Sequence, residues 1–130
     1  MRKLYIIEKF ELVDHQLYFI LNENDVNLQI QPAKQVIADS DNFAFIYLVD
    51  SGQDYSYLRF PPSIWSQLVY LLQQEQNPML KWGEQFIELE DFVDELRILI
   101  FNIENNDNYG SQFTNAVETA FSSILQHDEV

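Results

Sequence analysis

Apolar and polar positions along the chain predict two strands and a helix most clearly between Asp41 and Leu72. Residues 43–49 are apolar on both faces of a strand, which is typical of a central strand that is covered twice. Residues 50–54 provide Asp, Ser and Gly for a turn, and residues 55–60 return as an antiparallel strand. Two prolines then end the strand and suit a helix start. One face of this helix is expected to carry Ile64, Trp65, Leu68, Leu71 and Leu72.

The first 40 residues predict further strands. Residues 4–12 and 17–21 alternate as an opening hairpin, and residues 26–30 alternate as a strand near a sheet edge that ends before Pro32. Residues 33–38 are compatible with a short strand. The apolar face of the first strand is expected to consist of Leu4, Ile6, Phe10 and Leu12.

After the central helix, the chain predicts a hairpin and two more helices. Residues 79–82 and 85–89 flank Gly83-Glu84, which suits a two-residue turn. Residues 91–103 predict a helix in which Ile98 and Phe101 widen the apolar arc. Such an arc is typical of a helix buried on two sides, which is the interpretation we favour; the alternative is a helix that also contacts a partner. In the last helix, from residue 111, apolar residues repeat at helical spacing: Phe113, Ala116, Val117, Ala120, Phe121, Ile124 and Leu125.

Together these elements predict an α+β protein. The 130 residues suffice for one core, so we expect a single domain over residues 1–130. Its mainly antiparallel sheet of about six or seven strands should be packed by three helices, two of them C-terminal.

The charge of the chain excludes several classes of partner. The net charge is -14, and residues 82–130 hold 11 acidic side chains but a single basic one, Arg97. Nucleic-acid affinity comes largely from Lys and Arg, so direct binding to nucleic acid or to an anionic membrane is not expected.

The absence of cysteine excludes disulfides and thiolate catalysis. Without an apolar run of about 18 residues, no membrane span is expected, and we predict a cytoplasmic protein.

Candidate chemistry is sparse. His15 and His127 are the only histidines, and neither has a partner at catalytic or ligand spacing, so both are expected on the surface. The acidic run 88–95 is typical of a solvated helix face. The chain lacks a G-x-S-x-G sequence, a P-loop and a dinucleotide fingerprint. We expect no cofactor, we assign no catalytic residue, and we favour a protein that is not an enzyme.

Two polar loops are the candidates for a binding site. Residues 105–110 fail the EF-hand pattern because Tyr109 and Ala116 occupy its fifth and twelfth positions, and residues 39–42 lack its glycine. We therefore expect no metal site, and turn and capping chemistry explains both loops. Loops also carry function, so a ligand site stays open as an alternative. The binding candidates are Asp39, Asp41, Asn42, Asn105, Asp107, Asn108 and Tyr109.

Three segments, occurring in this order, carry a resemblance to a known family: Ala38-Asp39-Ser40-Asp41-Asn42-Phe43, then residues 61–65, then Asn102-Ile103-Glu104 continuing through Asn108-Tyr109-Gly110 to Ala116-Val117-Glu118. Over about residues 35–125 the chain resembles a small, acidic, uncharacterised protein family of Gram-positive bacteria. The N-terminal hairpin matches it less well. The resemblance implies a bacterial cytosolic protein and supplies no activity, cofactor or catalytic residue.

Three functions are compatible with this sequence. The first is a non-enzymatic protein–protein interaction or regulatory module, with a protein partner or as a homodimer, using the apolar arc with Ile98 and Phe101 or an edge strand. The second is an acidic mimic of nucleic acid that occupies a basic site on a partner protein. The third is an enzyme or small-ligand binder with a pocket near Asp39, Asp41 and Asn42 or near residues 105–109. We favour the interaction module.

Overall fold

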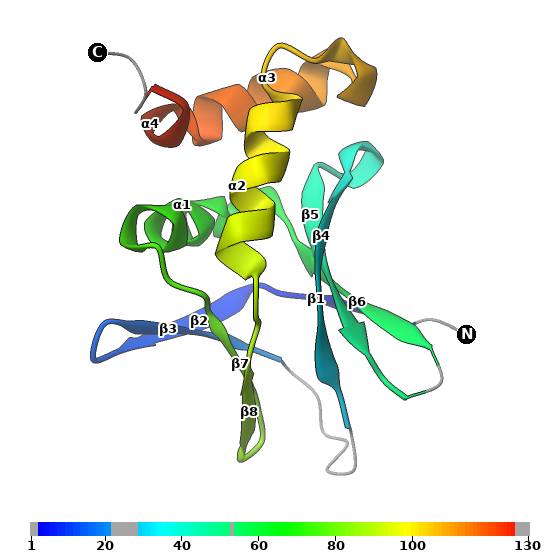
Figure 1. Ribbon diagram of the computed structural model, residues 1–130, viewed down its shortest axis with the longest axis vertical. Helices are drawn as coiled ribbons and strands as arrows, with labels where there is room; N and C mark the ends of the chain where they lie inside the picture. Colours follow the sequence, from blue (N-terminus) through cyan, green and yellow to red (C-terminus); the bar gives the residue numbers. More distant parts are fainter. Residues whose placement is uncertain (1–2, 22–28, 53, 127–130) are drawn as a thin grey trace.

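The computed structural model in Figure 1 describes residues 3–21, 29–52 and 54–126, and it has the predicted α+β class. Its strands are β1 (Leu4–Ile6), β2 (Lys9–Val13), β3 (Gln16–Ile20), β4 (Gln31–Asp39), β5 (Ala44–Asp50), β6 (Tyr55–Phe60), β7 (Met79–Trp82) and β8 (Gln85–Glu88). Its helices are α1 (Trp65–Gln74), α2 (Phe92–Ile103), α3 (Ser111–Ala120) and the short α4 (Ser122–Leu125). Three 3-10 turns are η1 (Ser40–Asn42), η2 (Pro62–Ile64) and η3 (Asp107–Tyr109). Among the helices described, none is long and apolar enough to cross a membrane.

The strands form two sheets, where the sequence suggested one. The first has the order β1-β6-β5-β4 and the second the order β2-β3-β7-β8. Pairing is mainly antiparallel, as predicted, but β1 pairs with β6 and β3 with β7 in parallel. In Figure 1 the two sheets lie beside each other and the helices gather toward one end. Because β1 and β2 are consecutive in the chain, the N-terminal segment crosses from one sheet to the other.

The single strand predicted over residues 4–12 is wrong, because the chain forms β1 and β2 there, in different sheets. The chain stays in the first sheet up to Ile7, whose N–H donates to the carbonyl of Arg59 at 2.8 Å, and it then leaves for the second sheet. Ile7 is buried, whereas the four residues predicted to share the apolar face are exposed: Leu4, Ile6, Phe10 and Leu12. The alternation of apolar and polar residues correctly placed Leu4 with Ile6 on one face of a strand, and Phe10 with Leu12 on one face of a strand. It could not show that both strands would lie at sheet edges.

The central part of the prediction is confirmed. β5 lies between β4 and β6, and it is buried over most of its length. All five residues predicted for the apolar face of the helix after the prolines are buried: Ile64, Trp65, Leu68, Leu71 and Leu72. β7 and β8 form the expected hairpin, in which Gly83 has φ of 58°. Local pattern and turn chemistry therefore agree in this region.

Residues 26–30 were predicted as a strand that ends before Pro32, and most of them fall outside the described residues. Pro32 itself lies inside β4, where the register with β5 shifts between Pro32 and Val36. β4 is an edge strand, and an edge at a bulge is where a strand accommodates a proline.

α2 is buried on one side only, so the interpretation favoured from its sequence is wrong. The helix packs against β4, and its buried side chains are Phe92, Val93, Leu96, Ile100 and Ile103. Ile98 is 60% exposed and Phe101 is 37% exposed. The wide apolar arc therefore includes a surface that faces solvent.

The predicted last helix is two helices, because Phe121 has a non-helical backbone (φ -108°, ψ 23°) between α3 and α4. Most of the predicted apolar face is buried, including Phe113, Val117 and Phe121, but Ala120 is exposed. The bend turns α4 toward α1, with which it packs. Apolar spacing identified the buried face but not the break.

Aromatic rings from both sheets and α2 meet in the core. The ring centroid of Phe92 lies 5.3 Å from that of Phe60, 5.5 Å from that of Tyr47 and 6.4 Å from that of Phe19. Phe19 belongs to the second sheet, and Phe60 and Tyr47 belong to the first. Phe92 therefore joins the two sheets at one point, where such contacts add to the burial of apolar area.

The buried phenol of Tyr47 connects this core to the start of α2. Its hydroxyl donates to the backbone carbonyl of Glu90 at 2.7 Å. Burial, followed by the negative charges of Glu90, Asp91 and Glu88, raises the pKa of Tyr47 well above its usual value of 10, against a smaller opposing effect of a backbone hydrogen bond at Lys34. The folded protein thus holds the neutral phenol.

We expect Phe92→Ala to lower the free energy of unfolding by about 3 to 5 kcal/mol, because it removes a ring that touches both sheets. Phe86→Ala, at a side chain that is 60% exposed, is the matched control and should change it by less than about 0.5 kcal/mol. Urea unfolding followed by fluorescence measures both. Equal costs for the two variants would contradict the described core.

We expect Tyr47→Phe to lower the free energy of unfolding by about 1 kcal/mol at neutral pH, through loss of the hydrogen bond to Glu90. Below pH 10 the phenol is neutral in both states; above pH 10 only the unfolded chain ionises it, so wild-type stability should fall by up to about 1.4 kcal/mol per pH unit from this group. The variant lacks this loss, so the two stability curves should converge in alkali. Curves that stay parallel above pH 10 would show that Tyr47 is not held neutral.

Candidate functional site

The two polar loops predicted as binding candidates lie next to each other. η1 and the loop that contains η3 both lie at the upper right of Figure 1. They border one hollow of about 400 Å³. Its lining consists of Ser40, Asp41, Phe43, Tyr109, Gly110, Ser111, Gln112 and Phe113. From the sequence, the two loops were predicted as separate candidate sites. In the fold they form two walls of the same hollow, which we call the loop hollow.

Aromatic contacts hold the two walls together. The Phe113 ring, at the start of α3, meets the Phe43 ring edge-on at 5.9 Å and the Tyr109 ring at 6.4 Å. Phe43 follows η1 in a left-handed conformation with φ of 52°. Since Phe113 is buried, it fixes the separation of both loops from within the core.

In the first loop, the carboxylate of Asp39 is bound by other side chains of the protein. Its carboxylate lies 3.0 Å from Nη2 of Arg59, and Nδ2 of Asn42 donates to both of its oxygens at 3.1 Å. Asp41 is exposed and lines the loop hollow. Asp39 and Asn42 thus hold the turn, and Asp41 faces a solvent-accessible surface.

In the second loop, hydrogen bonds with side chains hold the backbone of the turn. The N–H of Asn105 donates to Oε2 of Glu118 at 2.8 Å, and the N–H of Asn108 donates to Oδ1 of Asn106 at 3.1 Å. Oγ1 of Thr114 donates to the carbonyl of Asn106 at 2.8 Å. These are the turn and cap bonds that Asn and Thr supply.

Two of the seven predicted binding residues, Asp41 and Tyr109, therefore line the loop hollow. The other five lie outside its lining: Asp39, Asn42, Asn105, Asp107 and Asn108. Asp39 and Asn42 use their side chains in the bonds described above, and Asn105 and Asn108 use their backbone N–H groups. The candidates predicted from the sequence did not include the other six residues of the lining: Ser40, Phe43, Gly110, Ser111, Gln112 and Phe113. A ligand at this hollow stays a prediction.

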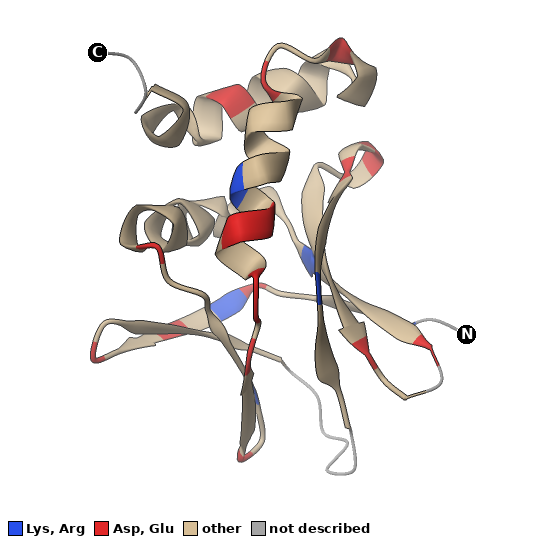
Figure 2. Ribbon diagram, in the orientation of Figure 1, with Lys and Arg blue, Asp and Glu red and all other residues tan. Residues whose placement is uncertain are grey.

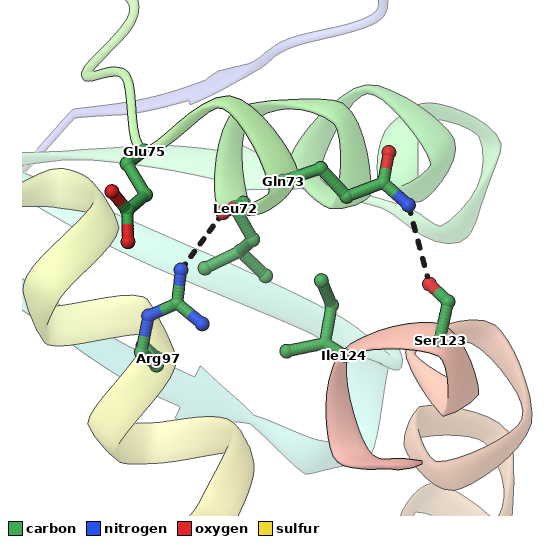
Figure 3. A pocket seen from close by; sticks show the side chains of 6 residues that line it. All are labelled: Leu72, Gln73, Glu75, Arg97, Ser123 and Ile124. Atoms are coloured by element: carbon green, nitrogen blue, oxygen red, sulfur yellow. Dashed lines mark hydrogen bonds between the residues drawn. The ribbon is translucent and has the colours of Figure 1, made fainter. Parts of the chain in front are cut away.

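A second hollow of about 360 Å³ lies between α1, α2 and α4 (Figure 3), lined by Leu72, Gln73, Glu75, Arg97, Ser123 and Ile124. Nη2 of Arg97 donates to the carbonyl of Leu72 at 2.8 Å, near the C-terminus of α1, where a cation complements the helix dipole. Nε2 of Gln73 reaches Oγ of Ser123 at 3.5 Å. The hydrogen bonds in this hollow connect α1 to α2 and α4. The only feature of the sequence that could have pointed to this hollow is Arg97, the single Lys or Arg after position 81.

The histidine prediction can be checked at one position. His15 is exposed in the turn between β2 and β3, as expected, and its carbonyl accepts hydrogen bonds from Nε2 of Gln76 at 2.8 Å and from the Tyr70 hydroxyl at 3.3 Å. His127 lies outside the described residues. Within the ranges 3–21, 29–52 and 54–126, no three His, Asp or Glu side chains gather as a metal ligand set.

Large apolar side chains are exposed in two clusters. Nine such residues are exposed in the described part of the chain, and five of them fall within residues 4–13, which we call the N-terminal ribbon: Leu4, Ile6, Phe10, Leu12 and Val13. Each of these five is between 42% and 52% exposed. The second cluster is Ile98 and Phe101, one helical turn apart on α2, which we call the α2 patch. The sequence pattern grouped Leu4, Ile6, Phe10 and Leu12 on one face but did not show whether that face is buried.

Comparison with known proteins identifies relatives but no activity. A family model described as a family of unknown function, UPF0738, matches residues 5–121. A UPF0738 protein of Lysinibacillus sphaericus is 55% identical over 125 residues, which cover 96% of this chain and 98% of the relative. A UPF0738 protein of Staphylococcus epidermidis is 38% identical over 119 residues (92% and 96%), and one of a Geobacillus species is 35% identical over 122 residues (93% and 98%). No solved structure matches this chain.

The resemblance drawn from three short segments, to an uncharacterised family of Gram-positive bacteria, is confirmed. The match is wider than those segments indicated, because it begins at residue 5 and includes the N-terminal strands. In the fold, the segments meet around α3. The loop hollow is bordered by Ser40, Asp41, Phe43, Tyr109 and Gly110, and a shallow groove on the same helix is bordered by Pro62, Trp65 and Ala116.

We expect Asp39→Ala to lower the free energy of unfolding by about 1.5 to 3 kcal/mol, because it leaves the largely buried Arg59 and the Asn42 amide without their acceptor. Asp41→Ala, two residues away and exposed, is the control and should stay within about 0.5 kcal/mol of wild type. Chemical denaturation at pH 7 measures both. If Asp41→Ala proved the more costly, the assignment of Asp39 to structure and Asp41 to the open surface would be wrong.

Proposed function

Because this chain belongs to the UPF0738 family, whose function is unknown, we propose a function from its own surface: a non-enzymatic protein–protein interaction module. The observation that carries the proposal is the clustering of exposed apolar side chains. Seven of the nine exposed large apolar residues in the described ranges fall in the N-terminal ribbon or the α2 patch. Single exposed apolar residues are ordinary on a soluble protein, whereas clusters are typical of interaction sites.

The α2 patch supports a protein partner. Ile98 and Phe101 stand on a helix whose opposite face is buried in the core, so they are presented by a rigid support. One exposed acidic residue, Asp94, lies one turn before Ile98. An apolar centre within a polar surround is the usual composition of an interface.

A second candidate, the acidic mimic of nucleic acid, is favoured by a separate observation. Exposed carboxylates follow one another from the end of β8 into the first turn of α2, shown in red in Figure 2. They are Glu88, Glu90, Asp91 and Asp94. A basic surface on a partner would be attracted to this row, and its binding would depend on salt.

The test is capture of partners by the tagged protein from its native host, with quantitative mass spectrometry after washes at low and high salt. We expect a protein partner that remains in both washes and that Ile98→Glu with Phe101→Glu depletes by about tenfold or more, because a charge enters the apolar centre of the contact. The control is Phe86→Glu, a side chain that is also 60% exposed but outside both clusters.

Each other outcome has a definite meaning. A partner that is lost at high salt and is insensitive to the α2 variant would favour the acidic mimic. Absence of any partner in both washes, in a chain that is also monomeric, would overturn the interaction function.

A further inference from the structure

β2 has an open edge, with backbone groups that face away from the protein. It is the first strand of its sheet, paired to β3 and to no other described strand, and all five of its residues are exposed. Such an edge is a ready template for another strand. It also carries Phe10, Leu12 and Val13, three of the exposed residues of the N-terminal ribbon.

The hydrogen bonds of β3 establish which groups of β2 point outward. The N–H of Leu17 donates to Oε1 of Gln76 at 3.1 Å and the N–H of Leu21 donates to the carbonyl of Lys81 at 2.8 Å, so odd-numbered residues of β3 bond away from β2. Even-numbered residues of β3 therefore bond to β2, where their partners are Lys9, Glu11 and Val13. The N–H and C=O groups of Phe10 and Leu12 consequently point to the free side.

We propose that a second copy of this chain binds at this edge, with β2 antiparallel to β2 of the copy and the twofold axis at Phe10. In this register Phe10 faces Phe10 of the copy, and both residues supply outward-pointing backbone groups. Lys9 then faces Glu11 of the copy, and Glu11 faces Lys9. These two opposite-charge pairs fall at positions that are not hydrogen-bonded, where side chains of facing strands are closest.

Other registers fit the strand less well. A twofold axis at Glu11 places the two Glu11 carboxylates opposite each other, which is destabilising. An axis at Leu12 places Phe10 opposite Asp14, which is in the turn with φ of 51° and cannot continue a ladder. The order Lys9-Phe10-Glu11 is thus complementary to itself about Phe10.

Charge also favours a copy at this surface. The whole chain carries -14, so two copies repel each other over most orientations. The ribbon and the residue before it are balanced, with Lys3 and Lys9 against Glu8 and Glu11. On the outer face of the sheet, Glu11 already lies 3.9 Å from Nζ of Lys81, and Lys9 of the copy would place a second cation beside it. The ribbon is therefore where two acidic chains can meet without net repulsion.

This inference deepens the interaction function proposed above, and rests on it, by naming the partner at the N-terminal ribbon. The two four-stranded sheets of a pair of copies would join through β2 into one continuous sheet. Addition of a strand at an exposed edge is a recurring mode of association, in which backbone bonds give affinity and side chains give register. Phe10 and Leu12 would leave solvent on assembly.

The test is sedimentation equilibrium of the full chain at physiological salt over low to high micromolar concentration. We expect a dimer with twice the 15.4 kDa chain mass. Lys9→Glu and Glu11→Lys, each alone, should weaken the dimer by about tenfold or more, because each places like charges opposite each other. The double variant restores opposite charges in this register and should return the affinity to near the wild-type value.

Phe86→Glu is the matched control, because Phe86 is exposed on β8 at the other edge of the same sheet, and it should leave the dimer intact. Circular dichroism and thermal unfolding check that each variant is folded. A folded monomer at all concentrations overturns the proposal. So does a dimer that ignores both single substitutions, or one that the double variant fails to restore.

These results separate the two proposals. A monomeric chain whose cellular partner is lost with the α2 variant refutes the β2 dimer and leaves the interaction function standing. A β2 dimer that captures nothing else confirms the dimer, and it limits the interaction function to self-association.

Discussion

The packing of the Phe92 ring against rings from both sheets is the contact on which this structure depends. Phe19 comes from one sheet and Tyr47 and Phe60 from the other, and the helix that carries Phe92 begins directly after the carbonyl that Tyr47 binds. The Phe19 and Phe60 rings also meet directly, with centroids 5.0 Å apart, so Phe92 completes a cluster in which the two sheets touch. A small domain has few such buried points, so each one determines a large part of the arrangement.

The core is concentrated around Phe92, and other apolar residues are therefore exposed to solvent. The rings and helices cover the middle of each sheet, and the two N-terminal strands are left as edges with Leu4, Ile6, Phe10, Leu12 and Val13 in solvent. Likewise, one face of α2 is buried in the core, and Ile98 and Phe101 are exposed on the opposite face. In a chain this acidic, the N-terminal ribbon has balanced charge, whereas the α2 patch lies beside exposed carboxylates of the first turn of α2.

The loop hollow shows how a candidate site depends on packing. Residues 39–42 and 105–109 were identified from their composition, because Asp and Asn mark turns wherever they cluster. Composition could not show that the rings of Phe43 and Tyr109 would both contact the ring of Phe113. It also could not show that Arg59 would bind Asp39. Arg59 is 20 residues from Asp39 in the chain, and its role is set by its place on β6, the second neighbour of β4 across the sheet.

The sequence by itself determined the elements whose signals are local. These are the central strand β5 and its hairpin with β6, the helix after the prolines with its five buried residues, the Gly83 turn, and the starts of α2 and α3. Tertiary structure decided what depends on distant neighbours: the division into two sheets, the exposure of the N-terminal ribbon and of Ile98 and Phe101, and the break at Phe121. The physical reason is that periodicity shows which residues share a face, whereas burial of that face depends on which part of the chain packs against it.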